Sequence, residues 1–208
     1  MQTGRRRKLN TGLSRPRRLL PVLGLAALLS ACAAAPPSAE ITQPPPQHPP
    51  LLPPASVDAP HQAEQVMRGA FGTRDFTLRC VVRATPAQIF VVGLTATGQR
   101  AFSVSWDGTA WDTRSAPMVP DSLRPDLLIA DVQLALWPLP ALQAAYAPAG
   151  WEVSEPGGGV RRLRQGGRIV AEVHYADPHP WNGRYWISNF RYSYSLEIEP
   201  APAAAGAQ

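Results

Sequence analysis

The segment DSLRPDLLIADVQLALWP, residues 121–138, separates two parts of the chain that both carry the pattern of β-strands. Its apolar residues recur three and four positions apart, which is the spacing of one face of an α-helix: Leu128, Val132 and Leu136. Because proline cannot continue a helix, we expect this helix to end before Pro138. A second short helix is predicted from Pro140 to Pro148, since proline is well tolerated in the first turn of a helix.

Before this helical insert, the sequence predicts a meander of antiparallel strands. In DFTLRCVVRA, residues 75–84, apolar and polar residues alternate, so Cys80 shares the apolar face. The segment 88–100 is apolar on both faces before a turn, and AFSVSW, residues 101–106, alternates again. The pair Asp107-Gly108 is a hairpin signal, after which TAWDT returns along the sheet.

After the insert the strand pattern resumes in WEVSE, VRRLRQ and RIVAEVHYA. The last segment, YWISNFRYSYSLEIE, residues 185–199, is predicted as one strand with a single apolar face: Trp186, Phe190, Tyr192, Tyr194, Leu196 and Ile198. Strands, a helical insert and strands again indicate an α+β domain, mainly β, over residues 61–199. We expect a curved, open antiparallel half-barrel with a short helical lid.

Residues 1–31 have the features of a lipoprotein signal peptide. Seven Lys or Arg and no acidic residue precede position 32, and the apolar run from Leu19 to Leu29 is short. The sequence Leu29-Ser30-Ala31-Cys32 resembles the lipobox of bacterial lipoproteins, which implies cleavage before Cys32 and a diacylglyceride on its sulfur. An ordinary signal peptide with an incidental cysteine is the alternative. By resemblance to lipoprotein sorting rules, Ala33 favours the outer membrane, with the domain on its periplasmic face.

Removal of this leader changes the charge of the chain. The whole sequence has 20 Lys+Arg and 15 Asp+Glu, and the leader holds seven of the basic residues, so the mature chain has a formal net charge of −2. A nucleic-acid partner would require a basic footprint, and none is expected here.

Residues 32–60 are predicted to be the lipidated cysteine and a Pro-rich tether. Ten of the 25 residues from Pro36 to Pro60 are prolines, a composition that favours extended polyproline II. The tether is interpreted either as a spacer or as a Pro-rich recognition ligand. With Cys32 acylated, Cys80 has no disulfide partner and is expected to be buried. The tail, residues 200–208, is predicted to be disordered.

The sequence predicts no catalytic site, no metal site and no cofactor. His174, Asp177 and His179 could gather as metal ligands, but surface and loop positions are the favoured interpretation because Asp177-Pro178 has the composition of a turn. No nucleophile elbow, phosphate-binding glycine loop or Cys/His zinc spacing is present. The sequence therefore favours a protein that is not an enzyme.

A run of arginines forms a local basic patch: Arg161, Arg162, Arg164 and, across a turn, Arg168. One interpretation is a solvated strand face. The other is contact with lipid headgroup phosphates or an acidic partner, for which the planar guanidinium is suited.

Several of these features together resemble the bacterial lipoproteins grouped as domain of unknown function 3261: the lipobox, the Pro-rich spacer, the strand meander, LIADVQLALWP and SNFRYSYSLEI. The resemblance covers residues 62–199. That family resembles LolA and LolB, the carrier and the outer-membrane receptor of lipoproteins, and its members are often encoded with genes for aryl-polyene lipids. The resemblance implies an open antiparallel barrel closed by helices around a cavity for acyl chains. Strand alternation then proposes five residues that line the cavity: Phe102, Trp106, Trp186, Phe190 and Tyr192.

LolB-like receptors also carry an exposed hydrophobic loop, whereas the hairpins here, TATGQ, WDGT and QGGR, are short and polar. This departure favours lipid binding and handover over insertion of lipoproteins.

The sequence thus predicts a non-catalytic outer-membrane lipoprotein that binds a lipid or acyl chain and hands it over, in lipoprotein or polyene-lipid trafficking. Its partners would be the membrane, through the anchor, and a periplasmic carrier or envelope complex. The alternative is a tethered interaction domain that docks on an envelope complex, with a solid core and no ligand. The internal volume of the domain distinguishes the two.

Overall fold

The computed structural model describes residues 48–71, 74–117, 119 and 124–202. The predicted signal peptide, Cys32, most of the tether and most of the tail lie outside the described residues. In chain order, the elements are η1 (Pro54–Ser56), β1 (His61–Phe71), β2 (Arg74–Ala84), β3 (Ile89–Leu94), β4 (Arg100–Trp106), β5 (Trp111–Ser115), α1 (Pro125–Leu136), α2 (Leu139–Tyr146), η2 (Ala147–Ala149), β6 (Trp151–Gly157), β7 (Val160–Gln165), β8 (Arg168–Tyr175), β9 (Tyr185–Asn189) and β10 (Tyr194–Pro200).

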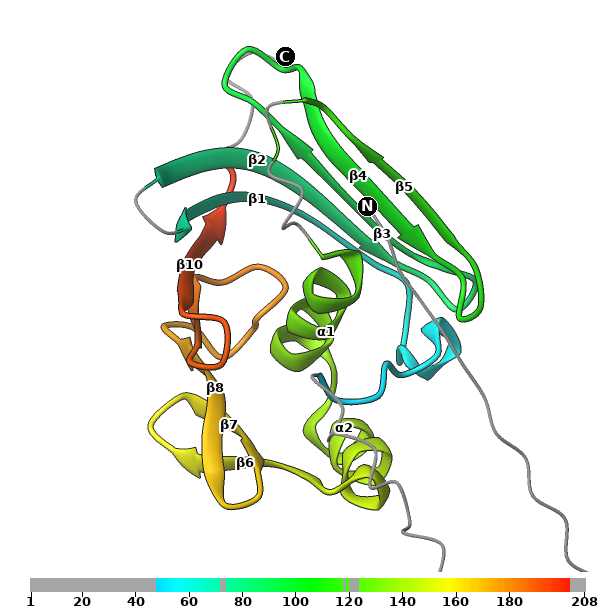
Figure 1. The fold of residues 1–208 in the computed structure, drawn as a ribbon, viewed down its shortest axis with the longest axis vertical. Helices are drawn as coiled ribbons and strands as arrows, with labels where there is room; N and C mark the ends of the chain where they lie inside the picture. The colour runs from blue at the N-terminus through cyan, green and yellow to red at the C-terminus, as the bar shows by residue number, and fades with distance from the viewer. Residues whose placement is uncertain (1–47, 72–73, 118, 120–123, 203–208) are drawn as a thin grey trace, which may run out of the picture. The chain divides into compact units, whose positions relative to one another are not determined.

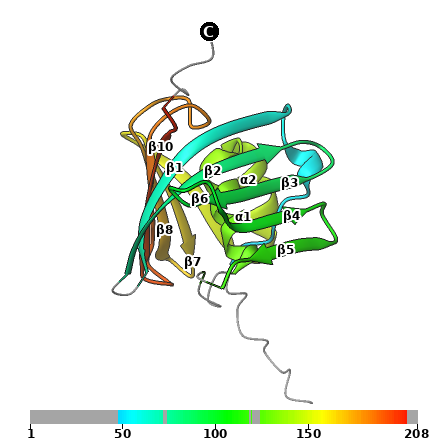
Figure 2. The same cartoon turned by 90° about the horizontal axis from the view of Figure 1, so that it is seen from above.

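The ten strands form one sheet in the order β5-β4-β3-β2-β1-β10-β9-β8-β7-β6. All neighbouring strands are antiparallel and consecutive in the sequence, except that β1 pairs with β10. Helices α1 and α2 connect the two edge strands, β5 and β6. The sheet curves around α1 in both views (Figure 1, Figure 2). The predicted fold class, a mainly β, open antiparallel sheet with two short helices, is confirmed.

The strand alternation predicted before the insert is also confirmed. Cys80, Phe102 and Trp106 are all buried on the inner face. Burial raises the pKa of the Cys80 thiol to about 12, so the thiol stays protonated in the core. Gly93 is paired with Phe102, and a Cβ at Gly93 would lie 2.4 Å from the Phe102 ring. Only glycine lets this ring lie across β3.

Strand β1 was not predicted, because its inner face does not read as apolar. The inward positions include Gln65, which is buried, and Gly69. The Gln65 Oε1 atom accepts a hydrogen bond from the Tyr185 hydroxyl at 3.5 Å. A polar side chain on the inner face hides the period of two that identifies a strand.

Helix α1 lies inside the curve of the sheet rather than across its rim (Figure 2). Every side chain from Ile129 to Trp137 is buried, including the polar Asp131 and Gln133. A helix with only one apolar face would leave its other face in water, whereas this segment is apolar almost all round. Neither of the two α-helices in the described residues is long and apolar enough to cross a membrane.

The prediction of a single final strand over residues 185–199 is wrong. The segment forms two strands, β9 and β10, joined by a turn at residues 190–193. The Asn189 side-chain oxygen accepts a hydrogen bond from the backbone N–H of Tyr192 at 3.1 Å, and Ser193 has a φ of 55°. Asparagine side chains commonly stabilise turns in this way.

The hairpin reverses the predicted orientation of β9. Ile187 is paired with Leu196, so odd-numbered residues of β9 share a face with even-numbered residues of β10. Tyr185 and Ile187 are buried, whereas Trp186 points to the opposite face and is 37% exposed. The predicted face is therefore correct for β10 and reversed for β9.

The folded part of the chain begins before the predicted boundary at residue 61. Residues 48–57, here called the strap, pack beside α1, and Leu52, Pro54 and Val57 are buried. The amide of Gln133 on α1 bonds both backbone groups of Leu52, accepting from its N–H at 2.9 Å and donating to its C=O at 2.6 Å. The end of the Pro-rich segment is thus part of the domain, because a buried glutamine satisfies its backbone.

Replacement of Gln133 tests this attachment. We expect Gln133→Leu to lower the free energy of unfolding by about 2 kcal/mol, because two buried backbone groups of Leu52 lose their partner. Protease cleavage within the strap should become faster. Gln143→Leu is the matched control, since Gln143 is exposed and donates only to the Val153 carbonyl at 3.2 Å. Urea unfolding and limited proteolysis that did not distinguish the two variants would contradict this role.

Candidate functional site

Side chains of the sheet bind the C-terminal end of α1. The Arg161 Nη1 atom donates to the carbonyls of Leu134 at 2.7 Å and Trp137 at 2.8 Å. The Tyr175 hydroxyl donates to the carbonyl of Ala135 at 2.7 Å. The last carbonyls of a helix have no partner within the helix, so strands β7 and β8 supply the donors that they need.

A buried carboxyl joins the middle of α1 to the opposite hairpin. The Tyr194 hydroxyl donates to Asp131 Oδ2, and Asn189 Nδ2 donates to the Tyr194 oxygen at 3.1 Å. Burial raises the pKa of Asp131 to about 7, although the hydrogen bonds from Tyr194 and Asn189 oppose the rise. The Asp131 carboxyl therefore changes charge near neutral pH, inside the domain.

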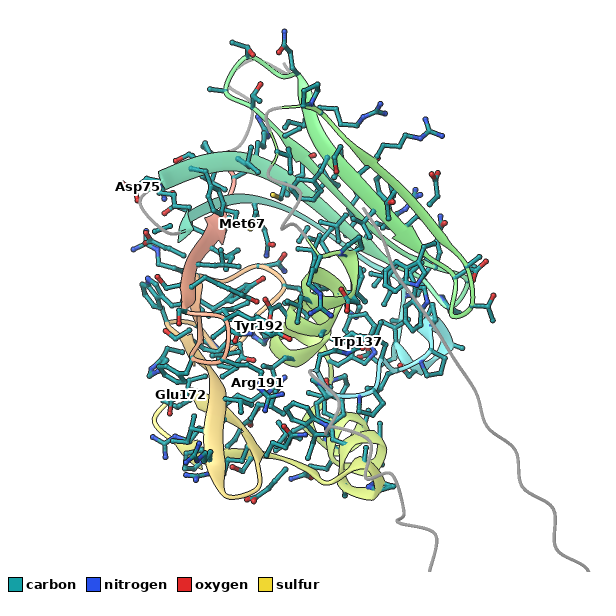
Figure 3. All side chains as sticks on the ribbon, viewed as in Figure 1. Met67, Asp75, Trp137, Glu172, Arg191 and Tyr192 are labelled. Carbon is teal, nitrogen blue, oxygen red and sulfur yellow. The ribbon has the colours of Figure 1, made fainter. Side chains whose placement is uncertain are left out.

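The N-terminal end of α1 carries an ion-pair cluster. Arg124 pairs with Asp126 and donates to the Tyr192 hydroxyl at 3.3 Å, and His48 Nε2 lies 3.0 Å from Asp126 Oδ2. Burial alone would raise the pKa of Asp126, but Arg124 and His48 lower it overall. Figure 3 shows Tyr192, with its neighbour Arg191, on the side of the β9–β10 turn that faces α1.

A small cavity lies between α1 and strands β6–β9, and we call it the α1 cavity. Its volume is about 20 Å³, close to the space that one water molecule needs. Most of its lining is apolar, and the polar residues are few. The lining residues are His48, Pro49, Leu127, Ala130, Asp131, Leu134, Trp151, Leu163, Val170, Ala171, Asn189 and Arg191.

None of the five aromatic residues predicted from the sequence lines this cavity. Phe102 and Trp106 belong to the solid core on β4. Trp186 lies on the outer face of β9, and Phe190, in the β9–β10 turn, is 53% exposed. Tyr192 is half-buried under the Arg124 guanidinium, 5.7 Å from its ring. The assignment of Trp186 and Phe190 to an inner wall is corrected, because the final segment is a hairpin.

Phe190 borders a different feature, an open depression beside the β9–β10 turn. Its other lining residues are Ala70, Ser188, Asn189, Ser193, Tyr194 and Ser195. Three of its seven lining residues are serines, and the depression is not enclosed.

The arginine run does not form one surface. Arg161 is buried against α1 and pairs with Glu155, so the prediction that it contacts a headgroup or partner is wrong. Arg162 points to the other face of β7 and pairs with Glu172 at 2.6 Å. Arg164 donates to the carbonyl of Gly167 at 3.1 Å, and Arg168 is exposed. The alternation of the strand divides the run between core and solvent.

The histidines of the sequence HYADPHP remain apart. His174 is exposed and lies 3.2 Å from Glu172, while Asp177 accepts the backbone N–H of Arg184 at 3.0 Å. Among the described residues, no three His, Cys, Asp or Glu side chains gather as metal ligands would.

Sequence reasoning missed the polar residues of the α1 cavity: His48, Asp131, Trp151, Asn189 and Arg191. One of these residues could have been recognised from the sequence. Asp131 interrupts an apolar helical segment, and acidic residues are almost never buried without a partner. No sequence pattern identifies Asn189 and Arg191, because their positions in the cavity wall depend on the β9–β10 hairpin.

The chain was compared with protein families, with curated proteins and with solved structures. The family model described as "Protein of unknown function (DUF3261)" matches residues 62–202. Among solved structures, the chain is similar to a domain from Vibrio parahaemolyticus described as an outer membrane lipoprotein-sorting protein domain. The TM-score is 0.37 and the identity 7%, over 74% of this chain and 90% of that chain. No curated protein matches.

Proposed function

The chain belongs to the family of proteins of unknown function DUF3261, and we propose that its domain is a non-catalytic carrier that holds an acyl chain between α1 and strands β6–β9. One observation carries the proposal. The α1 cavity is largely apolar, it has a few polar residues, and one of its walls is helix α1, which would move outward to admit a ligand. Apolar sites with a few polar groups bind apolar ligands.

The attachments of α1 support such a movement. Besides apolar packing in the core, side-chain hydrogen bonds and ion pairs join the helix to strands β7–β10 and to the strap, from Arg161, Tyr175 and Tyr194 among others. Side-chain contacts can be exchanged for solvent without breaking the sheet or the helix. A displacement of α1 from β6–β9 would enlarge the cavity along a helix of about 18 Å.

The acyl chain would replace apolar contacts that α1 gives up. Burial of hydrocarbon is worth about 0.8 kcal/mol per methylene, so ten methylenes supply about 8 kcal/mol toward opening and binding. Exchange of the chain with a partner then requires that α1 moves outward again, which breaks its hydrogen bonds with Arg161, Tyr175 and Tyr194. This is binding and handover without any chemical step.

In the cell, the carrier would act at the periplasmic face of the outer membrane, held there by acylated Cys32 and the tether before the strap. Two acyl chains are sufficient for stable attachment to a membrane. A lipid or polyene-lipid carrier of the envelope, or a periplasmic partner, would deliver or receive the ligand.

The first test is to identify what the protein binds. The protein is purified gently from a bacterial envelope, and native mass spectrometry measures the mass of the intact complex. A stoichiometric lipid in addition to the anchor would support the carrier. A protein without such a lipid, which also takes up no added fatty acid or phospholipid, would contradict it.

Filling the cavity should block binding. Ala130 on α1 lines the cavity, so we expect Ala130→Leu to weaken the uptake of a fluorescent fatty acid at least tenfold. Ala135→Leu is the matched control, because Ala135 lies on the same helix and is buried but does not line the cavity. Both variants carry a similar overpacking cost of about 1–3 kcal/mol. Equal uptake by the two variants would argue against this cavity as the site.

One observation favours a second function, a tethered docking domain without a ligand. In this structure the cavity measures about 20 Å³, whereas ligand sites are typically ~300–1,000 Å³. If the protein takes up no acyl probe, and neither Ala130→Leu nor Ala135→Leu changes its association with the envelope, the closed interior is simply its core.

A further inference from the structure

The indole N–H of Trp151 is buried, and no described residue accepts a hydrogen bond from it. Trp151 begins β6, is 3% exposed, and its Nε1 atom is unpaired. The indole of Trp137, which is also buried, donates to the Ser56 hydroxyl at 2.8 Å. A buried indole N–H normally has a partner. This donor is therefore available to an oxygen of a ligand.

The unpaired indole N–H belongs to a residue in the wall of the α1 cavity. Trp151 lines the α1 cavity. Two other buried polar atoms are unpaired, Gln65 Nε2 and the Tyr146 hydroxyl, but neither residue lines the cavity. Within the described part of the chain, Trp151 is the residue that combines an unpaired buried donor with the cavity wall.

A positive charge lies directly beside the same indole. The Arg191 guanidinium carbon is 5.0 Å from the centre of the Trp151 ring, and Arg191 is an exposed residue that lines the cavity. An exposed residue in a cavity wall stands at the mouth. Arginine also donates to Gln165 Oε1, and its planar fork of five N–H groups can serve more than one acceptor.

Apart from His48, Asp131 and Asn189, the remaining residues that line the cavity are apolar. Leu127, Leu134, Leu163 and Val170 offer only hydrocarbon. The site thus combines an apolar wall with an N–H donor and a cation beside it. A ligand that matches is an apolar chain with an acceptor oxygen at one end.

We propose that the carboxyl oxygen of an acyl chain, as fatty acid or fatty ester, accepts the hydrogen bond of the Trp151 indole beneath the Arg191 guanidinium, with the hydrocarbon along α1. The inference rests on the proposed function, and it adds the chemical class of the ligand and its orientation. The acyl carboxyl end lies at the mouth, and the methyl end lies deeper.

Asp131 does not oppose this arrangement. Its carboxyl is hydrogen-bonded by Tyr194 on β10, whose oxygen is bonded in turn by Asn189 on β9. Burial raises the pKa of Asp131 to about 7, so that at slightly acidic pH the carboxyl is largely neutral and does not repel an anion.

Three probes with the same 16-carbon chain test the inference at pH 6: palmitate, the neutral ester monopalmitoylglycerol, and hexadecyltrimethylammonium, which has no acceptor oxygen. Binding to the purified protein is measured by calorimetry. We expect Trp151→Phe to weaken palmitate and the ester about tenfold, the effect of one hydrogen bond, and to leave the ammonium probe unchanged. Arg191→Gln should weaken palmitate more than the ester, because only palmitate is charged.

Trp106→Phe and Arg164→Gln are the matched controls. Trp106 is buried in the core but does not line the cavity. Arg164, on β7, does not line the cavity either. If Trp151→Phe does not fold, the wild-type protein gives the answer by NMR. Of its six indole N–H signals, one should move on addition of palmitate and not of hexadecyltrimethylammonium.

The outcomes are distinct. If wild type binds none of the three probes, the proposed function fails, and this inference fails with it. If it binds them and neither Trp151→Phe nor the indole signals respond to the carboxyl group, the carrier remains and the assigned orientation is overturned. A preference for palmitate identifies a free fatty acid as the source of the carboxyl, and a preference for monopalmitoylglycerol identifies an esterified lipid.

Discussion

Replacement of Arg161 by methionine is expected to lower the free energy of unfolding by about 3–5 kcal/mol, as when one partner is removed from a buried, charged hydrogen-bond network. The side chains are similar in length, so the change removes donors more than volume. The carbonyls of Leu134 and Trp137, both at the buried end of α1, would lose the donor that now lies within 2.8 Å of each. Urea unfolding followed by circular dichroism measures the loss.

The adjacent arginine provides the control. Arg162 points out of the sheet and pairs with Glu172 at 2.6 Å, with its side chain 35% exposed. Such an ion pair contributes about 0–1 kcal/mol, so Arg162→Met should change stability little. Two equal losses would show that the run acts as a surface patch and that Arg161 does not hold α1.

Replacement of Asp131 by asparagine is expected to remove a pH dependence of stability. The pKa of Asp131 rises from its ordinary value of 3.8 to about 7 on folding, mainly through burial. At about 1.4 kcal/mol per pKa unit, this difference corresponds to about 4 kcal/mol. The asparagine keeps an oxygen that accepts from Tyr194 and has no charge to bury.

The direction in which stability changes with pH depends on whether the folded or the unfolded state binds the proton more tightly. Between pH 4 and pH 7 the folded protein keeps the Asp131 proton while the unfolded chain loses it, so rising pH favours unfolding. Below pH 4 both states are protonated, and above pH 8 the full cost is present. We therefore expect wild type to lose about 4 kcal/mol relative to Asp131→Asn between pH 4 and pH 8.

Other carboxyl groups do not disturb this comparison. Asp58, Asp126 and Glu172 have lowered pKa values, mainly or in part through hydrogen bonds from His61, Arg124 and Arg162, and they stabilise the fold above the acid range. They are present in both proteins and cancel in the difference. Asp112→Asn, at an exposed site on β5, controls for the loss of a carboxylate. A constant difference between wild type and Asp131→Asn across this range would contradict a buried, titrating Asp131.

Much of the fold was predictable because its signals are local. The spacing of Leu128, Val132 and Leu136, ended by Pro138, determines a helix, and the structure places α1 at Pro125–Leu136. The alternation around Cys80 and Phe102 determines strands and their inner faces. Helical and strand periods involve only residues a few positions apart, so the sequence alone contains them.

The alternation of apolar and polar residues did not show which side chains of β9 face inward. Alternation continues through residues 185–199, but Asn189 and Ser193 close a turn within it. The turn moved Trp186 to the outside and Tyr185 to the inside. A turn that preserves the apparent period can be found only from the pairing of the two strands.

The candidate site was decided by tertiary structure alone. Asp131, Trp151 and Arg191 come from a helix, an edge strand and a turn, and they meet only because the sheet curves around α1. By itself, the sequence determined the order and types of most elements. Which polar side chains became buried together depended on contacts between residues far apart in the chain, and no local period records these.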